Sequence, residues 1–402
     1  SVLNILEKFH SFRRMKFCVL GGGGYLGQVL ARDLRKDSHE VVLLDLQFPS
    51  FPAIGLNLNT VKCIKGSILD REKLKEALQG SDACFHIAAY GMSGGASLDK
   101  DMTYLVNVEG TNLVIAECIA AGCRRLIFTS TIAVVFGDKE IHDLQEDAPY
   151  VDKFLTYYGE SKCIAEKNIL RVAREKKLET CALRLRGIYG PGEMRSTHTT
   201  VEICSKGLFK ATFEKSSPCL SQYSNVENVC QAMMLAEKSL RRGHKSPTNG
   251  NAYFIVDGGP PIENVGFWFP LIKAIGQKPP SMRVPYWFIY YLAFLSEMVY
   301  HIFKIEPLFT RFEVNLLALT NTYSIKKAVE DFGYSPVNNH CLEKTIEYYS
   351  SHPEIFSKEK QKQMFPREAF WSKLFMFITI AVISSFIWPF LGSLQKENIV
   401  VN

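Results

Sequence analysis

Tyr158 and Lys162 are the clearest candidates for an acid–base pair, because they lie four residues apart in Tyr-Gly-Glu-Ser-Lys. On a helix, residues at this spacing lie one above the other on the same face. A free phenol has a pKa of about 10 and is a poor base at neutral pH. A neighbouring ammonium group stabilises the phenolate and lowers that pKa. The pair therefore predicts proton transfer at a hydroxyl or carbonyl group. Tyr157 fits less well, because its lysine would be five residues away.

A further hydroxyl group is expected beside this pair, from the segment Thr129-Ser130-Thr131. The segment ends an apolar run that resembles a buried strand, and ligands bind at the carboxyl ends of parallel strands. Thr131 or Ser130 would donate a hydrogen bond to the reacting carbonyl oxygen. The alternative role for either hydroxyl is to cap a helix or to end the strand.

A glycine cluster near the start of the chain, Gly21-Gly-Gly-Gly24-Tyr25-Leu26-Gly27, predicts a nucleotide site. It follows the apolar run 16–20 and opens an apolar-periodic segment at 25–34, which is the order strand, tight turn, helix. Amides at the start of such a helix bind the pyrophosphate of a dinucleotide. Contacts with the cofactor are expected from Gly21, Gly24, Tyr25 and Gly27.

The choice of cofactor is indicated by Asp45, which ends the next apolar run eighteen residues after Gly27. A carboxylate there binds ribose hydroxyls and repels a 2′-phosphate. Because no Lys or Arg follows in Asp45-Leu-Gln-Phe, NAD is favoured over NADP. Ala88 is also expected at the cofactor, and Asn107 is expected either to orient backbone and cofactor or to start a helix. His86 lies in an apolar run and is expected to be a hydrogen-bonded core histidine that lines the cofactor turn, not a catalytic base.

The elements that position these residues follow from the alternation of apolar runs with helical patterns. Candidate strands are 17–20, 41–44, 61–65, 83–88, 125–129 and 180–185, and candidate helices between them include 71–78, 107–121 and 158–176. Near-continuous apolar strands with helical crossovers predict a parallel sheet covered on both faces. The predicted fold is α/β, a doubly wound Rossmann-type sheet, and a late strand at 253–256 is expected at its edge.

The rest of the chain lacks this regular alternation and is expected to form a smaller C-terminal substrate region. The predicted division is an N-terminal extension at 1–15, a nucleotide-binding domain at 16–260 with a substrate-region insertion at about 191–250, and a substrate-binding cap at 261–355. Within the cap, 285–303 is unusually aromatic. It contains Glu297 and His301, so a pocket-lining or interfacial helix is favoured over a second membrane span.

The C-terminal residues predict a membrane anchor. Residues 374–391 are eighteen uncharged, mostly apolar residues, a length that just spans a bilayer core, and tryptophans favour its interfaces. The predicted division here is a basic linker at 356–373, a transmembrane helix at 374–392 and a short tail at 393–402. Five lysines and arginines precede the span and one follows it, so the large domain is expected in the cytosol. The alternative is a buried helix of the soluble domain.

Composition excludes several other classes. With 47% hydrophobic and 22% charged residues the chain is globular, and a net charge of +6 without a long basic block in its first 350 residues gives no reason to expect nucleic-acid binding. The eleven cysteines are irregularly spaced, which favours reduced thiols and offers no paired zinc ligands. No metal site is expected. Residues 1–14 lack the apolar core of a signal peptide.

Five segments together resemble the extended short-chain dehydrogenase/reductases over about residues 16–350. Within that superfamily the chain is most similar to the 3-beta-hydroxysteroid dehydrogenase group and to short-chain dehydrogenase/reductase family 42E. The matching segments are FHIAAYGMSG (85–94), NVEGTNLVIAEC (107–118), FTSTIAVVFG (128–137), YYGESKCIAEK (157–167) and RGIYGPGE (186–193).

The resemblance implies an NAD-dependent enzyme that acts on a steroid or sterol. It makes Tyr158 the proton acceptor and donor and Lys162 its cofactor-binding partner, places Thr131 at the catalytic Ser/Thr position, and places the glycines on the pyrophosphate turn. It also implies a membrane-bound location, for which the endoplasmic reticulum is expected, and allows a homodimer. The chain departs from the family at Ser67, where an acidic residue is usual, and at Leu185, where a proline is usual.

Other functions stay open from the sequence alone. A nucleotide-sugar epimerase or dehydratase uses the same groups, but its pocket would need polar side chains where this chain has the aromatic segment 285–303. A non-catalytic NAD-binding membrane scaffold is a further alternative. A sterol dehydrogenase coupled to decarboxylation would differ only in its product.

Overall fold

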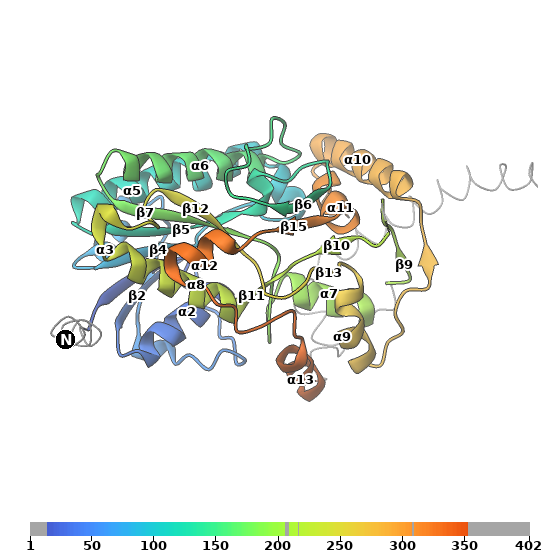
Figure 1. Ribbon diagram of the computed structural model, residues 1–402, viewed down its shortest axis with the longest axis horizontal. Helices are drawn as coiled ribbons and strands as arrows, with labels where there is room; N and C mark the ends of the chain where they lie inside the picture. The colour runs from blue at the N-terminus through green and yellow to red at the C-terminus, as the bar shows by residue number, and fades with distance from the viewer. Residues whose placement is uncertain (1–13, 206–208, 216, 308, 353–402) are drawn as a thin grey trace, which may run out of the picture.

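A sheet of seven parallel strands forms the centre of the molecule (Figure 1). The computed structural model describes residues 14–205, 209–215, 217–307 and 309–352. The strand order is β12-β7-β5-β4-β1-β2-β3. The strands are β1 (Lys16–Leu20), β2 (Glu40–Asp45), β3 (Lys62–Lys65), β4 (Ala83–His86), β5 (Arg125–Thr131), β7 (Glu179–Leu185) and β12 (Asn251–Ile255). The predicted doubly wound parallel sheet is confirmed, and the late strand forms one edge of it.

The strand order reverses between β1 and β4, where a ligand site is expected. The chain builds outward from β1 to β2 and β3 and then returns to the other side of β1 with β4, β5, β7 and β12. At such a reversal, the carboxyl ends of neighbouring strands leave a crevice for a ligand. Leu20 and His86 are paired at these two strand ends. The glycine turn after β1 and the segment after β4 therefore meet at this crevice.

Helices cover both faces of the sheet (Figure 1). One face packs against α2 (Tyr25–Lys36), α8 (Val226–Leu240) and α12 (Lys326–Phe332). The other packs against α3 (Arg71–Leu78), α5 (Gly110–Ala120) and α6 (Tyr157–Arg174). Because strand side chains alternate between faces, Val19 lies in the first core and Leu20 in the second. Both faces of the sheet are thus buried, as its apolar strands require.

A smaller region lies beyond the carboxyl ends of the strands, on the right in Figure 1. Its largest sheet has the strand order β13-β10-β15-β6. The short strands are β6 (Ile141–Leu144), β8 (Ile188–Tyr189), β9 (Ala211–Thr212), β10 (Leu220–Ser221), β11 (Ser224–Asn225), β13 (Ile262–Glu263), β14 (Met282–Arg283) and β15 (Asn321–Tyr323). The helices are α7 (Ser196–Ser205), α9 (Phe269–Ala274), α10 (Tyr286–Phe303), α11 (Arg311–Ala318) and α13 (Glu343–Ser351), and α4 (Lys100–Tyr104) precedes α5.

Two helices within the predicted substrate region pack on the central sheet. Helix α8 lies within the expected insertion at 191–250 and α12 within the expected cap at 261–355, yet both pack on the central sheet. Their apolar faces complete the core over β7 and β12, which α2 alone does not cover. The boundaries between the two regions stay a prediction.

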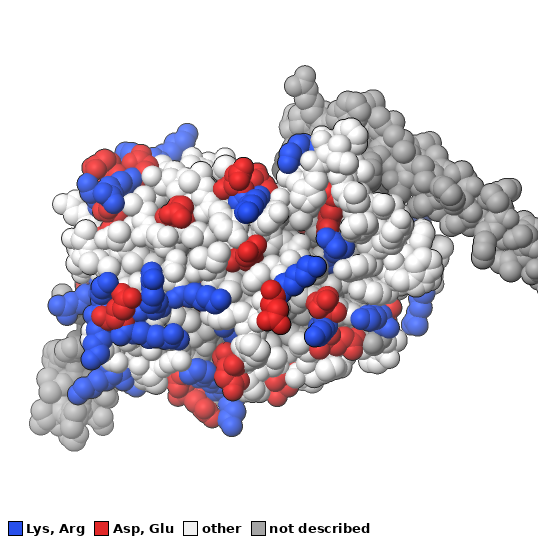
Figure 2. All heavy atoms as spheres, turned by 90° about the horizontal axis from the view of Figure 1, so that it is seen from above, with Lys and Arg blue, Asp and Glu red and all other residues white. Residues whose placement is uncertain are grey.

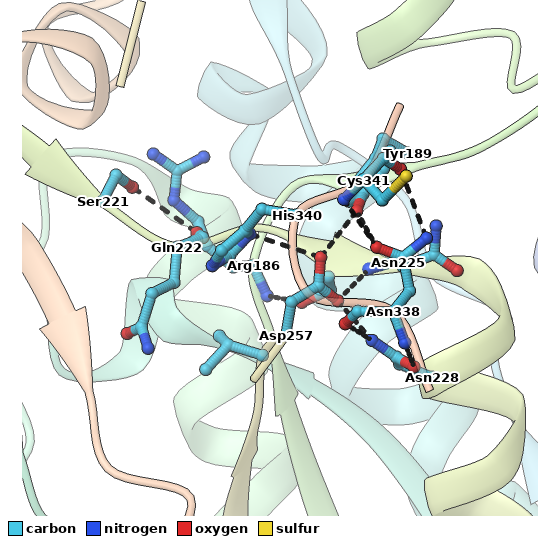
Figure 3. Close-up of polar contacts among 12 residues, drawn as sticks. Arg186, Tyr189, Ser221, Gln222, Asn225, Asn228, Asp257, Asn338, His340 and Cys341 are labelled. Carbon is cyan, nitrogen blue, oxygen red and sulfur yellow. Dashed lines mark hydrogen bonds and ion pairs between the residues drawn. The ribbon is translucent and has the colours of Figure 1, made fainter. Parts of the chain in front are cut away.

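Asp257, two residues after β12, joins the sheet edge to the smaller region (Figure 3). Its carboxylate accepts hydrogen bonds from the Tyr189 hydroxyl, the Asn225 amide and the Asn228 side chain, each at 2.7 Å. His340 Nδ1 lies 3.3 Å from the same carboxylate. Because Asp257 is fully buried, these partners replace its lost hydration. The cluster ties α8 and the chain around His340 to the end of β12.

Among the described residues, no helix is long and apolar enough to cross a membrane. The predicted linker, anchor and tail at 356–402 lie outside the described residues, as does most of the predicted N-terminal extension. All eleven cysteines are free thiols and nine of them are buried. Within the described ranges, no group of three or more His, Cys, Asp and Glu side chains is arranged to hold a metal.

Candidate active site

Tyr158 lies in the first turn of α6, beside the end of β5. The helix begins after Thr156, whose hydroxyl accepts a hydrogen bond from the Gly159 amide at 3.2 Å. This cap fixes the first turn, and Tyr158 is only 7% exposed. Burial raises the pKa of Tyr158 to about 12, while the charge of Arg195 and a hydrogen bond with the Thr131 side chain act in the opposite direction. The phenol therefore lies next to one of the two hydroxyls expected at the site.

The structure distinguishes Thr131 from Ser130, which the sequence left as alternatives. Neighbouring side chains of a strand point to opposite faces. Thr131 interacts with Tyr158 and also accepts a hydrogen bond from the Ala133 amide at 3.2 Å, so it caps the short turn that follows β5. Ser130 is buried and donates to the Glu166 carboxylate. Thr131 is thus the hydroxyl available beside Tyr158, and it also has the capping role.

Lys162 follows Tyr158 by one turn of α6 and is 2% exposed. Its ammonium donates to the Thr129 carbonyl at 2.6 Å and lies 3.9 Å from the centre of the Phe128 ring. Burial lowers the pKa of Lys162 to about 7, whereas the Glu166 carboxylate raises it. Tyr158 and Lys162 share the helix face that the spacing predicts, with the ammonium directed to the end of β5.

Glu166, one further turn along α6, is a buried charged residue whose role the sequence did not indicate. It is 0% exposed, and it accepts hydrogen bonds from Arg184 Nη2 at 2.7 Å, from the Tyr150 hydroxyl at 2.9 Å and from Ser130. Arg184 lies on β7 and Ser130 on β5, so one carboxylate joins the helix to two strands. The available signal was its position four residues after Lys162, which places it on the same helix face.

His86, at the end of β4, is fully buried as expected. Its Nε2 forms a hydrogen bond with the Thr111 hydroxyl at 2.9 Å. Nδ1 has no hydrogen-bond partner among the described residues. Burial, together with the charge of Lys162, lowers the pKa of His86 to about 3. The ring is therefore neutral at physiological pH.

Asn107 orients backbone, which is one of the two roles that the sequence left open. Its side chain donates to the Tyr90 carbonyl at 2.9 Å and accepts from the Tyr90 amide at 2.8 Å. The same amide group donates to the Ser161 hydroxyl at 3.0 Å, and Ser161 in turn donates to the Tyr158 carbonyl at 3.0 Å. Asn107 thus ties the segment after β4 to the first turn of α6. It lies in a single π-helical turn at 105–109, not at a helix start.

The glycine turn between β1 and α2 has the geometry of a close backbone approach. Gly21 has φ +86°, and a Cβ atom there would lie 2.6 Å from the Ala88 amide nitrogen. A Cβ atom on Gly27 would lie 2.4 Å from the Gly21 carbonyl oxygen. Real Cβ atoms do not approach this closely, so both positions require glycine. The Ala88 amide donates to the Leu20 carbonyl at 2.9 Å, which places Ala88 against the turn.

Gly24 and Asp45 complete a cradle for an anionic group at the start of α2. Gly24 is exposed, and a Cβ atom there would have no neighbour closer than 3.4 Å. The Asp45 carboxylate accepts hydrogen bonds from the Gly23 amide at 2.9 Å and the Leu46 amide at 2.7 Å. The open side of Gly24 exposes the first amides of α2, which lack partners within the helix. These residues fit the pyrophosphate and ribose of a dinucleotide.

Tyr25 lies at the first position of α2 and closes the turn from the other side. Its hydroxyl donates to the Pro191 carbonyl at 3.0 Å, and its ring meets that of Phe51 edge-on at 5.9 Å. Burial raises the pKa of Tyr25 far above its usual range, so it stays neutral. Tyr25 connects the glycine turn to the segment after β8.

The two departures from the family pattern have ordinary structural roles. The Ser67 hydroxyl accepts a hydrogen bond from the Leu69 amide at 3.1 Å, in the turn that leads to α3. Leu185 ends β7 and is paired with Thr131 on one side and with Ile255 on the other. It is buried in the core. The strand ends beside Thr131 are therefore regular.

Comparison with known proteins shows the family. The model of the 3-beta hydroxysteroid dehydrogenase/isomerase family matches residues 18–286. The short-chain dehydrogenase/reductase family 42E member 1 of Danio rerio is 37% identical over 347 residues, which are 83% of this chain and 88% of that protein. The 3beta-hydroxysteroid dehydrogenase/Delta(5)-Delta(4) isomerase 1 of Caenorhabditis elegans is 32% identical over 355 residues, 88% of this chain and 75% of that protein.

A solved structure of MoeE5 in complex with UDP-glucuronic acid and NAD is similar in fold, with a TM-score of 0.64, 20% identity and coverage of 84% of this chain and 99% of that chain. At this identity the likeness shows the fold alone, which agrees with the central sheet described above. The chain therefore belongs to the 3-beta hydroxysteroid dehydrogenase/isomerase family and is a nicotinamide-dinucleotide-dependent dehydrogenase of CH–OH groups.

Proposed function

We propose that this protein oxidises the 3β-hydroxyl group of a steroid or sterol-like substrate, or reduces the corresponding ketone, with NAD as its cofactor. The observation that carries the proposal is that α6 holds the buried side chains of Tyr158 and Lys162 at the carboxyl end of β5, where Lys162 donates to the Thr129 carbonyl at 2.6 Å. This is the end of the sheet at which the glycine cradle also lies. The family membership and the name of the Caenorhabditis elegans relative support the choice of a 3β-hydroxysteroid.

Three side chains handle the proton in this proposal. In the oxidation direction, Tyr158 accepts the hydroxyl proton as the carbinol carbon loses its hydride, and Thr131 donates a hydrogen bond to the developing carbonyl oxygen. Lys162 stabilises the Tyr158 phenolate by its charge. Because the pKa of Lys162 is about 7, the Glu166 carboxylate that raises it helps to keep the ammonium charged at neutral pH.

The cofactor would be held by Gly21, Gly24, Gly27 and the first amides of α2, with Lys162 at the nicotinamide ribose. The bound nicotinamide supplies a hydride acceptor. Asp45 supports NAD over NADP, because its carboxylate already lies against the turn and would repel a 2′-phosphate. Tyr25, Ala88 and Asn107 shape the cradle and the segment after β4.

The proposal includes a membrane location. The apolar residues 374–391 would anchor the chain in a bilayer with the enzyme on the cytosolic side, at the endoplasmic reticulum. A steroid dissolves in the same bilayer, so anchoring brings enzyme and substrate together. A homodimer is part of the proposal only by likeness to the family.

The test is NADH formation by the full chain with a panel of 3β-hydroxysteroids and sterols, beside nucleotide sugars. Tyr158→Phe removes the proton acceptor, and Tyr157→Phe is the matched control because it changes the neighbouring tyrosine of the same turn. We expect steroid-dependent NADH formation that falls at least a hundredfold in Tyr158→Phe and changes little in Tyr157→Phe. Turnover of a nucleotide sugar instead would contradict the substrate class. NAD binding without any turnover would favour a non-catalytic scaffold.

A further inference from the structure

Gln28 is a buried polar side chain in α2, the helix that follows the glycine turn. It is 1% exposed, and the neighbouring Leu26, Val29 and Leu30 belong to the apolar core. Charged side chains, in contrast, are distributed over the outer surface of the helices on the face seen in Figure 2. A polar group is costly to bury unless hydrogen bonds replace its lost hydration. The partners of Gln28 therefore indicate what this side chain does inside the protein.

The side-chain nitrogen of Gln28, Nε2, donates to two backbone carbonyls from different segments. One acceptor is the Gly23 carbonyl in the glycine turn, at 3.0 Å, and the other is the Pro49 carbonyl in the loop after β2, at 2.7 Å. A glutamine amide has two N–H donors, so it can serve both carbonyls at once. Gln28 thereby joins the glycine turn to the loop at 46–52.

The loop at 46–52 forms the wall of the cofactor cradle beyond Asp45. A Cβ atom on Gly23 would lie 1.9 Å from the Gln47 carbonyl oxygen, so this loop packs directly on the glycine turn. Leu46 follows Asp45 and is 63% exposed although it is apolar. The base of a nucleotide that is bound through its ribose to Asp45 would lie against this loop.

Gly23 is held from both sides by hydrogen bonds. Its amide donates to the Asp45 carboxylate at 2.9 Å, and its carbonyl accepts from Gln28 at 3.0 Å. Gly24, the N-cap residue of α2, has no side chain that could cap the helix. The contacts of Gly23 therefore fix the turn in place of a capping side chain, and they leave the first amides of α2 free for a phosphate group.

We propose that Gln28 is a positioning residue for cofactor binding, which holds the glycine turn and the loop at 46–52 in the arrangement that binds the adenosine half of NAD. Gln28 acts through these two segments and not by touching the cofactor. A turn and a loop that already have their bound positions lose less conformational freedom when the ligand arrives, which strengthens binding. The inference rests on the proposed NAD cradle and does not depend on which alcohol is the substrate.

The test measures the binding of NAD, AMP and nicotinamide mononucleotide to the full chain by calorimetry. Gln28→Met keeps the length of the side chain and removes both donors. We expect the dissociation constants of NAD and AMP to rise about tenfold, because two hydrogen bonds that hold the binding arrangement are lost, and that of nicotinamide mononucleotide to change less than about twofold. With an alcohol that the wild type oxidises, KM for NAD should rise by the same factor while kcat is unchanged. Amide hydrogen exchange in the loop at 46–52 should be faster in this variant.

The matched control is Val29→Ala, which truncates the next side chain of the same helix inside the apolar core. It should lower the thermal unfolding midpoint and leave the dissociation constant of AMP unchanged. Equal weakening of AMP binding by both variants would overturn the proposal, because Gln28 would then act through general stability. Unchanged AMP binding in Gln28→Met would also overturn it. Failure of the wild type to bind NAD would contradict the cofactor cradle itself and, with it, this inference.

Discussion

At the scale of single residues, the protein holds Tyr158 in a setting that opposes ionisation unless its neighbours act on it. Burial raises the pKa of the phenol to about 12, while the charge of Arg195 and the hydrogen bond with the Thr131 side chain lower it. A base for alcohol oxidation needs a pKa close to the working pH. The Thr131 hydroxyl is therefore expected to do two things, orienting the substrate oxygen and making the phenolate easier to form.

Replacement of Thr131 should change the pH dependence of oxidation. The rate rises with pH as the Tyr158 phenol ionises, so a variant with a higher phenol pKa reaches its plateau at a higher pH. Thr131→Val removes the hydrogen bond and should move the midpoint of the rise upward, whereas Thr131→Ser keeps the hydroxyl and the midpoint. Initial rates from pH 6 to 10 at saturating substrate measure this. Equal midpoints in the two variants would show that Thr131 does not act on Tyr158.

Lys162 should make the stability of the cofactor-free protein depend on pH. Its pKa is about 7 in the folded protein against 10.5 ordinarily, so between these values the unfolded chain binds the proton and the folded protein does not. Stability then rises with pH across this window, by at most about 1.4 kcal/mol per pH unit. Urea unfolding at pH 7, 8 and 9 should show this rise, and Lys162→Met should lose it.

The matched control for Lys162 is Lys167→Met, an exposed lysine on the same helix. It should keep the pH dependence of the unfolding free energy. The same slope in wild type and Lys162→Met would contradict the low pKa of the buried ammonium.

At the scale of elements, the site is held together by α6, which meets β5 and β7 through Glu166. The carboxylate joins Ser130 on β5 and Arg184 on β7, and the Glu166–Arg184 ion pair is buried, with side-chain exposures of 0% and 3%. Tyr158 and Lys162 lie on the same helix, so this contact sets the position of both relative to Thr131.

Loss of Glu166 should destabilise the protein strongly. Glu166→Ala leaves the Arg184 guanidinium buried and unpaired, which typically costs about 3–5 kcal/mol of unfolding free energy. The double change Glu166→Met and Arg184→Met should recover most of that loss, because apolar side chains then replace both charges. Glu175→Ala, at the exposed end of the same helix, serves as the control and should cost less than about 1 kcal/mol. Chemical denaturation measures all three, and a double variant no more stable than Glu166→Ala would contradict the ion-pair explanation.

The sheet could be predicted from the sequence, and the smaller region could not, for a physical reason. Strands β1, β2, β4, β5, β7 and β12 contain apolar runs long enough to show their burial in the sequence, whereas the edge strand β3 buries only Ile64. Strands β10, β13 and β15 are two or three residues long, and their partners lie up to a hundred residues away, as in the pairing of Ser221 with Asn321. No local pattern indicates such a pairing. In the same way, no local pattern in the sequence places α8 and α12 on the sheet.

At the site itself, residue type and spacing indicated Tyr158, Lys162 and the glycine turn, and the structure brings them to one end of the sheet. What the sequence did not indicate is the buried pair of Glu166 and Arg184, because charged residues are usually exposed. The alternation of side chains along a strand could have distinguished Thr131 from Ser130.

At the scale of the whole molecule, cofactor binding should increase the stability of the folded protein. A ligand present at a hundred times its dissociation constant stabilises the folded state by about 2.7 kcal/mol. We expect NAD to raise the thermal unfolding midpoint more than NADP at equal concentration, because the Asp45 carboxylate repels the 2′-phosphate.

Asp45→Asn tests that explanation, since an asparagine oxygen can still accept the Gly23 hydrogen bond while the charge is lost. The midpoint shift with NADP should rise toward the shift with NAD in this variant. A wild-type protein stabilised equally by both cofactors would contradict the proposed preference for NAD.

In the proposed reaction, hydride leaves the 3-carbon of a steroid-like alcohol within this site. The most direct measurement incubates the full chain with NAD and a 3β-hydroxysteroid that carries deuterium on carbon 3, followed by mass analysis of the nicotinamide product. We expect one deuterium in each reduced nicotinamide formed, in equal amount to the 3-ketone, and none with Tyr158→Phe. Ketone formed without deuterium in the cofactor, or reduced cofactor formed without loss of deuterium from the steroid, would contradict it.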